Sequence, residues 1–160
     1  MNTMKWGLIP EWSPAFSTKL STFNAKSETV FESKLYRRVI LQRRCIVPIS
    51  GFIEWKKDGA TKRPFRIYEK VRPMIALAGI WTSWHSGSPQ EGRSFSIMTT
   101  AANDFMSQIH DRMPVILDPK DFDAWLDPEV HEPEEIAKLL QPCRPELLDC
   151  CEVSTLVTSK

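Results

Sequence analysis

Apolar and polar residues alternate through much of the middle of the chain, with the period of two that is typical of half-exposed β-strands. Residues 51–56 alternate in this way, Asp58-Gly59 supplies a turn, and a second strand-like segment follows at residues 64–68. This pattern predicts a β-hairpin. Residues 74–81 are almost continuously apolar, which predicts a strand covered on both faces.

Further strands and two late helices complete the predicted architecture. The other strand-like segments are residues 44–48, 94–100, 113–117 and 147–153. The first helix opens at Asp118-Pro119, where the aspartate caps the helix, and the second runs from Pro133 until Pro142 stops it. Many short strands with few helices indicate an α+β fold, with a mainly antiparallel, barrel-like β core and a few peripheral helices.

The length of 160 residues and the apolar content of 42% suffice for one hydrophobic core, so we expect a single domain spanning residues 1–160. No apolar run reaches the length of about 18 residues that a membrane helix needs, and the start lacks the apolar stretch of a signal peptide. We therefore expect a cytoplasmic protein.

The four cysteines form no C-x-x-C pair and are expected to be reduced thiols.

The net charge of +1 hides an asymmetry along the chain. Residues 1–66 contain 13 Lys and Arg against 5 Asp and Glu, whereas the remaining residues contain 8 against 15. A basic surface that faces a polyanion such as nucleic acid would produce this split. Scattered, solvated surface charge would also produce it.

Two residues are candidates for acid–base chemistry. Glu54 stands among apolar residues in the predicted hairpin, where burial would raise the pKa of its carboxyl toward the range useful for a general acid. The alternative is a glutamate paired with a lysine on the wet face. His110 shares a loop with Asp111 and Arg112, whose guanidinium could hold a phosphate, and a structural salt-bridged loop is the alternative there.

Asn24 and Trp55 are candidates for binding rather than for proton transfer. The amide of Asn24 lies next to Lys26, although capping a short helix is the commoner role of such an asparagine. Trp55 is followed by two lysines, a setting that also suits stacking on an unpaired base. The three widely spaced histidines form no metal motif and no glycine-rich phosphate loop occurs, so neither a metal nor a cofactor is expected.

Six motifs occur in one order along the chain. They are Trp6-Gly7-Leu8-Ile9-Pro10-Glu11-Trp12, Asn24-Ala25-Lys26-Ser27-Glu28-Thr29, Arg44-Cys45-Ile46-Val47-Pro48, Gly51-Phe52-Ile53-Glu54-Trp55, Met98-Thr99-Thr100-Ala101-Ala102 and Ile109-His110-Asp111-Arg112-Met113-Pro114. In these motifs the chain resembles the SOS response-associated peptidase (SRAP) family, from about Met4 to Val153. The resemblance implies an intracellular protein of the DNA-damage response that binds abasic sites in single-stranded DNA.

The resemblance also implies a covalent chemistry. Family members carry a cysteine at position two, whose amine and thiol capture the abasic sugar aldehyde as a thiazolidine crosslink and which is linked to peptidase activity. By this resemblance Asn24 orients the N-terminal group, while Glu54 and His110 act as acid–base groups at the sugar. The implied phosphate contacts are Lys26, Thr99 and Arg112, and the implied neighbours of the flanking bases are Trp12 and Trp55.

The chain departs from the family pattern at its start and at Lys26. Family members open with Met-Cys-Gly-Arg, whereas this chain opens with Met1-Asn2-Thr3, so the crosslinking cysteine is absent from it and we expect an N-terminally truncated domain. A shortened gene product, a degenerate paralogue and a fragment complemented by another chain remain alternatives. Lys26 stands where arginine is expected, which keeps the charge but loses the planar fork.

Three functional hypotheses follow from these observations. The first is a non-covalent binder of abasic single-stranded DNA. The second is residual lyase or peptidase activity, with Lys26 as the amine that forms a Schiff base and with Glu54 and His110 as proton-transfer groups. The third is a structural remnant of the fold without DNA function. A basic groove that converges on Asn24, Glu54 and His110 would favour a DNA partner over the remnant.

Overall fold

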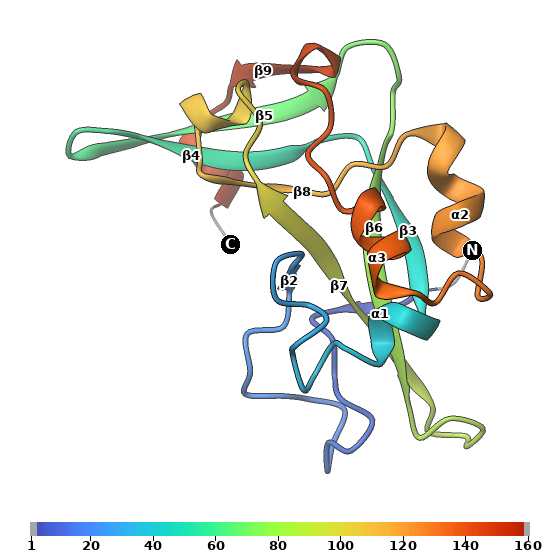
Figure 1. Cartoon of the computed structure of the whole chain (residues 1–160). Coiled ribbons are helices and arrows are strands. Elements are labelled where there is room, and N and C mark those ends of the chain that lie inside the picture. Colours follow the sequence, from blue (N-terminus) through green and yellow to red (C-terminus); the bar gives the residue numbers. More distant parts are fainter. Residues whose placement is uncertain (1–2, 159–160) are drawn as a thin grey trace.

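Two β-sheets and a layer of short helices make up the structure, a computed structural model that describes residues 3–158 (Figure 1). The six-stranded sheet contains β1 (Lys5–Trp6), β2 (Asn24–Lys26), β3 (Arg44–Ile49), β6 (Ile75–Trp84), β7 (Gly92–Ala101) and β8 (Arg112–Pro114). The three-stranded sheet contains β4 (Phe52–Asp58), β5 (Thr61–Glu69) and β9 (Leu148–Glu152). The helices are α1 (Val39–Gln42), α2 (Phe122–Leu126) and α3 (Pro133–Leu139), with 3-10 turns η1 (Met106–Gln108), η2 (Pro119–Asp121), η3 (Pro145–Leu147) and η4 (Thr155–Thr158).

The six-stranded sheet is assembled on β7. One edge of β7 pairs antiparallel with β6, where Ile97 lies opposite Gly79, and further along with β8, where Thr99 lies opposite Pro114. The other edge pairs in parallel with β1 and β2. The sheet curls into a half-barrel, and the β4–β5 hairpin projects to one side of it (Figure 1). This arrangement confirms the predicted α+β fold with a barrel-like β core.

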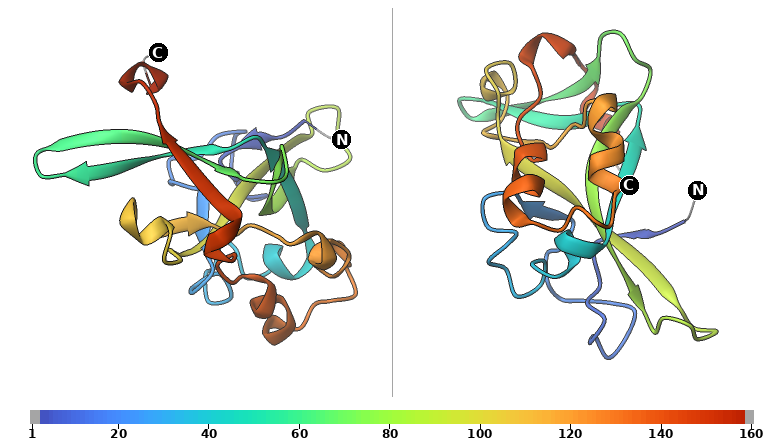
Figure 2. Two further views of the ribbon diagram at one scale, coloured as in Figure 1. Left: turned by 90° about the horizontal axis from the view of Figure 1, so that it is seen from above. Right: turned by 45° about the vertical axis from the view of Figure 1, so that its right-hand side comes forward.

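Two apolar cores hold these layers together. In the first, Ile40 of α1 and Trp125 of α2 are buried in one cluster with Met98 of β7. The second core lies between the two sheets and includes Ile67 of β5 and Leu77 of β6. Figure 2 shows the helices gathered on the side of the molecule away from the projecting hairpin. Among the described residues, no helix combines the length and apolar character needed to cross a membrane.

Most of the longer elements confirm the predictions. The hairpin predicted from residues 51–56 and 64–68 forms as β4 and β5, and the apolar run at 74–81 forms β6. The short elements β1, β2 and α1 were not predicted, because two to four residues carry too little periodicity to be recognised. Asn24 begins β2 instead of capping a helix, because β2 is created by pairing with the distant β7.

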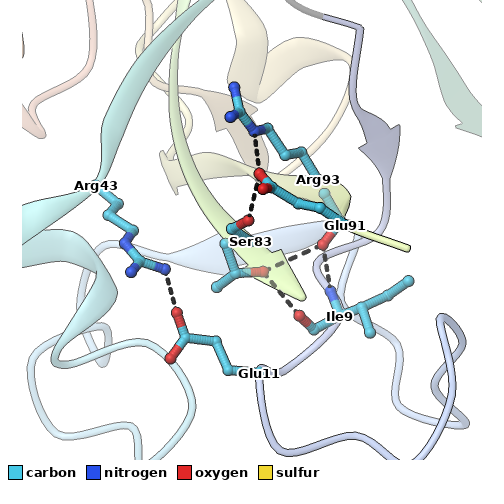
Figure 3. A network of polar contacts seen from close by, with 8 residues as sticks. Ile9, Glu11, Arg43, Ser83, Glu91 and Arg93 are labelled. Carbon is cyan, nitrogen blue, oxygen red and sulfur yellow. Dashed lines mark hydrogen bonds and ion pairs between the residues drawn. The ribbon is translucent and has the colours of Figure 1, made fainter. Parts of the chain in front are cut away.

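A small polar network fixes the segment that follows β1 (Figure 3). Ile9 donates its N–H to Ser94 Oγ at 2.7 Å, and its carbonyl accepts a hydrogen bond from Thr82 Oγ1 at 2.7 Å. Two residues further on, Glu11 forms an ion pair with Arg43. The chain after β1 is therefore held against β6 and β7, which leaves β1 in place at the edge of the sheet.

Arg44, the first residue of β3, is buried and joins the helices to the sheet. Its Nε donates to the carbonyl of Trp125 at 2.6 Å, and its terminal nitrogens donate to the carbonyls of Ile40 at 2.9 Å and Val130 at 2.8 Å, among others. Burial lowers the pKa of this guanidinium from its ordinary value. Its donors are nevertheless matched by backbone acceptors, which is the condition under which a buried cation is tolerated.

We predict that Arg44→Leu destabilises the protein by about 3 kcal/mol, because several buried carbonyls lose a charged donor together. Urea unfolding followed by circular dichroism measures this. The matched control is Arg37→Leu, since Arg37 is exposed and its side chain makes no hydrogen bond with the residues that the structure describes. That control should stay within about 0.5 kcal/mol of the parent. Equal destabilisation by the two variants would contradict the structural role of Arg44.

Candidate functional site

A cavity of about 660 Å³ opens on the face of the six-stranded sheet opposite the helices. Successive side chains of β7 alternate between the two faces: Phe95, Ile97 and Thr99 line the cavity, whereas Met98 is buried in the helix-side core. The volume lies within the range of small-ligand sites. The polar side chains around the cavity are those of Asn24, Lys26, Glu54, Thr99, His110 and Arg112, and the remaining lining is largely apolar.

Asn24 and Lys26 reach the cavity from β2. Ala25 between them is buried in the helix-side core, so the period-two geometry of a strand turns its two neighbours toward the cavity. The strand is held in parallel register with β7, Lys26 opposite Thr99, and Ser27 extends the pairing by donating its N–H to the Thr99 carbonyl at 2.8 Å. These contacts fix the backbone from which the amide and the amine project.

Glu54 reaches the cavity from β4, and Gly51 makes that position possible. The chain leaves β3 in one sheet and enters β4 in the other through Gly51, which has a φ of +152°. A Cβ atom at this residue would lie 2.7 Å from the carbonyl oxygen of Ile67. Only glycine therefore fits at this position in the connection between β3 and β4, and this connection places Glu54 at the cavity.

The surroundings of Glu54 favour the protonated acid. Its side chain is half-buried and makes no ion pair with a lysine in the described part of the chain. Burial raises the pKa of Glu54 above the ordinary carboxyl value, and the positive charge of His110 partly opposes this effect. Glu54 thus matches the buried alternative rather than the lysine-paired one. A carboxyl that keeps its proton closer to neutral pH is suited to general acid work.

His110 presents a defined nitrogen to its surroundings. The backbone N–H of Arg112 donates to His110 Nδ1 at 3.0 Å, and the Arg112 carbonyl lies 3.3 Å from the same nitrogen. The exposed carboxylate of Asp111 lies 3.1 Å from the same Nδ1 and accepts from it whenever Nδ1 carries a proton. The backbone N–H is a fixed donor at the shortest of these contacts, which favours the neutral tautomer with its proton on Nε2. The Nε2–H remains as a proton donor in the site.

Arg112 is anchored where β8 meets β7. It donates to Glu28 Oε1 at 2.6 Å and to Thr99 Oγ1 at 3.1 Å. The hydrogen bond from Arg112 lowers the pKa of Glu28, which keeps that carboxylate ionised and the pair intact. The Arg112 side chain is still 24% exposed. It therefore adds a positioned positive charge to the cavity.

The structure separates the two tryptophans that the resemblance implied as neighbours of the flanking bases. Trp55 lines a second hollow, of about 430 Å³, that shares Glu54 and His110 with the cavity. Trp12 is 74% exposed and lines a different hollow, of about 510 Å³. Only Trp55 is thus brought next to the acid–base pair. The other residues predicted for the site lie together in the cavity.

Two contributors to the cavity were not predicted. Trp6 of β1 lines it, and its Nε1 donates to the Phe23 carbonyl at 2.9 Å, which fixes the ring. Its place in the first sequence motif could have identified it. Glu28 anchors Arg112 across 84 residues of sequence, and nothing in the local pattern indicates that pairing.

Basic side chains from the first part of the chain gather at the hollows. Lys57 and Lys62 line the hollow beside Trp55. Four others, Lys34, Arg37, Arg38 and Arg43, line the hollow beside Trp12. Lys26, Lys57 and Lys62 thus lie at the cavity or in the hollow that shares Glu54 and His110 with it, whereas the other four lie at a separate hollow. A basic groove that converges on Asn24, Glu54 and His110 stays a prediction.

The cavity offers no thiol from the described part of the chain. All four cysteines are free, and none lines the cavity. Burial raises the pKa of Cys45 to about 12 and that of Cys143 to about 11, so both are neutral thiols of low reactivity. Within residues 3–158 no group of three or more His, Cys, Asp or Glu is arranged to hold a metal ion.

The structure is an α+β half-barrel with a cavity that contains two proton-transfer side chains, Glu54 and His110. Comparison with known proteins identifies its family. The sequence pattern of the family "SOS response associated peptidase (SRAP)" matches residues 1–160. Abasic site processing protein YoqW of Bacillus subtilis is 36% identical over 160 residues, which cover 99% of this chain and 71% of that protein. The chain therefore belongs to the SRAP family.

More distant relatives and a solved structure agree with this assignment. Abasic site processing protein HMCES of Gallus gallus is 31% identical, with 98% of this chain and 53% of that protein covered. A crystal structure of a protein from Bacteroides thetaiotaomicron matches with a TM-score of 0.89 and 36% identity, covering 98% of this chain and 71% of that one.

The raised pKa of Glu54 predicts a pH-dependent cost in stability. At pH values between the ordinary carboxyl pKa and the raised one, Glu54 holds a proton in the folded chain that it has lost in the unfolded chain. The free energy of unfolding therefore falls as the pH rises through this range. Glu54→Gln removes this loss. We expect its melting temperature to exceed that of the parent by about 1–3 °C at pH 8 and by less at pH 4.

Thermal melts at the two pH values test this expectation. Glu32→Gln is the matched control, because Glu32 is exposed and lies outside the cavity. It should show no pH-dependent gain. A gain for Glu54→Gln that is the same at both pH values, or a loss at pH 8, would contradict the buried acid.

Proposed function

We propose that this chain binds abasic sites of single-stranded DNA in the cavity, as a protein of the DNA-damage response. The observation that carries the proposal is the position of Glu54, whose pKa is raised, beside His110 in a cavity that also contains two cationic side chains. The names of the relatives, which describe abasic site processing, support the same substrate. A nucleotide without its base leaves space for the sugar to enter.

Each polar group of the cavity has a role in this proposal. Glu54, as the protonated acid, donates to the ring oxygen of the abasic sugar and so favours its open aldehyde form. His110 donates through Nε2–H to the sugar hydroxyl. The amide of Asn24 supplies both a donor and an acceptor to the same sugar.

The strand on either side of the lesion is held by charge and by stacking. Lys26 and Arg112 neutralise the phosphates that flank the sugar, and Lys57 and Lys62 continue the positive potential along the hairpin. Trp55 offers a flat ring beside these lysines on which an unpaired base stacks. A single strand supplies both the exposed bases and the flexibility that this path requires.

This binding does not require the cysteine that the resemblance associates with a crosslink. The groups invoked are the polar side chains of the cavity together with Trp55, Lys57 and Lys62 of the neighbouring hollow. Crosslinking and peptidase activity, by contrast, need a nucleophile that is not among the cysteines of the described residues.

The proposal predicts a steep dependence of affinity on salt. With three or four phosphates neutralised, the logarithm of the association constant should fall with the logarithm of salt concentration with a slope of roughly −2 to −3, or roughly 20- to 50-fold between 50 and 200 mM. Fluorescence anisotropy with an oligonucleotide that contains a tetrahydrofuran abasic analogue measures this. An affinity that does not change with salt would contradict the proposal.

Two variants test whether Arg112 contacts a phosphate of the DNA. Arg112→Ala should weaken binding by about tenfold and reduce the salt slope by about 0.7, the loss of one phosphate contact. Lys70→Ala, an exposed residue outside the cavity, is the control and should bind like the parent. Equal affinity for the abasic and the intact oligonucleotide in the parent would overturn the assignment of abasic sites.

A further inference from the structure

Among the residues that the structure describes, Lys26 supplies the one amine in the lining of the cavity. Of its two cationic side chains, Arg112 carries a guanidinium, which stays protonated and does not condense with aldehydes at neutral pH, whereas Lys26 carries a primary amine that can. The open form of an abasic sugar exposes an aldehyde at C1′. An aldehyde bound in this cavity would therefore face a group that can form a C–N bond with it.

Of the two cationic side chains, Lys26 is the one without a hydrogen-bond or ion-pair partner among the described residues. Arg112 is tied to Glu28 at 2.6 Å and to Thr99 at 3.1 Å. The ammonium of Lys26 makes no hydrogen bond or ion pair with the residues that the structure describes, although its charge contributes to lowering the pKa of Glu28. Its backbone is fixed by the pairing of β2 with β7, and its side chain lines the cavity.

Proton-transfer groups share the cavity with this amine. Imine formation needs an acid that can protonate a departing oxygen and a base that can accept the proton again. Glu54, with its raised pKa, and His110, with Nε2–H, line the same cavity as Lys26. No cysteine of the described residues lines it, so no thiol there competes for the aldehyde.

We propose that Lys26 is the nucleophile of an abasic-site lyase activity, a step that rests on the proposed binding of abasic DNA. Ring opening breaks the C1′–O4′ bond, with one proton added to O4′ and one lost from the C1′ hydroxyl. The ammonium of Lys26 loses one proton to water, and the neutral amine then attacks C1′. The carbonyl oxygen takes one proton from the amine and one from Glu54 and leaves as water, which leaves Glu54 ionised and joins Nζ to C1′ in a protonated imine.

The imine makes the C2′ proton acidic and so permits strand cleavage. The ionised Glu54 accepts the C2′ proton, the C–H electron pair forms the C2′=C3′ bond, and the C3′–O bond breaks with the 3′ phosphate as the leaving group. One water molecule then hydrolyses the imine, which regenerates Lys26 and releases an unsaturated aldehyde on the 5′ fragment. The water lost on imine formation is recovered in this hydrolysis.

Borohydride trapping tests the proposal, because it reduces the imine to a stable amine. The chain is incubated with a single-stranded oligonucleotide that carries a natural abasic site, in the presence of borohydride, and the adduct is mapped by peptide mass spectrometry. We expect the adduct on Lys26. Lys26→Arg keeps the charge but should lower the trapped yield at least about tenfold relative to the DNA bound. Lys70→Arg, outside the cavity, should trap like the parent.

Two results would overturn the proposal. One is the absence of a trapped adduct, and the other is an adduct that maps to Lys57, Lys62 or the α-amine of the chain. The tetrahydrofuran analogue cannot form an aldehyde, so binding to it reports on the proposed function alone. Binding of the analogue without trapping would reject the lyase and leave the binding function intact, whereas failure to bind the analogue would reject the binding function itself.

Discussion

The pairing of β7 along both of its edges is the constraint on which the rest of the structure depends. Its parallel partner β2 carries Asn24 and Lys26, and its antiparallel partner β8 begins with Arg112. These two short strands contain too few residues to be stable alone, and they exist because β7 supplies their hydrogen bonds. One strand therefore aligns three polar side chains from distant parts of the sequence around one cavity.

The second sheet adds the group that gives the cavity its acid–base character. β4 crosses over the half-barrel after Gly51 and places Glu54 where it is partly removed from water. Burial raises the pKa of this carboxyl, while Arg112 on the other side lowers the pKa of Glu28. The pKa values of these two carboxyls are thus shifted in opposite directions, because Glu54 lacks a strong cationic partner and Glu28 has one.

The longer parts of the fold could be predicted from the sequence, and the short ones could not. The hairpin and the strands around residues 74–81 and 94–100 carry enough periodicity to be recognised. β2 has three residues and depends on a partner far along the chain, so local pattern favoured a cap for Asn24. The site residues were indicated by motif order, but the separation of Trp12 from Trp55 depends on tertiary packing that no local pattern contains.

The central claim is that the abasic sugar lies in the cavity between β2, β4 and β8. A crystal structure of this chain with a single-stranded oligonucleotide that contains the tetrahydrofuran analogue tests it most directly. The claim predicts that the ring oxygen of the analogue lies within about 3.2 Å of a polar atom of Glu54 or His110, with a flanking phosphate at Arg112. DNA bound instead in the basic hollow beside Trp12, with the cavity unoccupied, would contradict it.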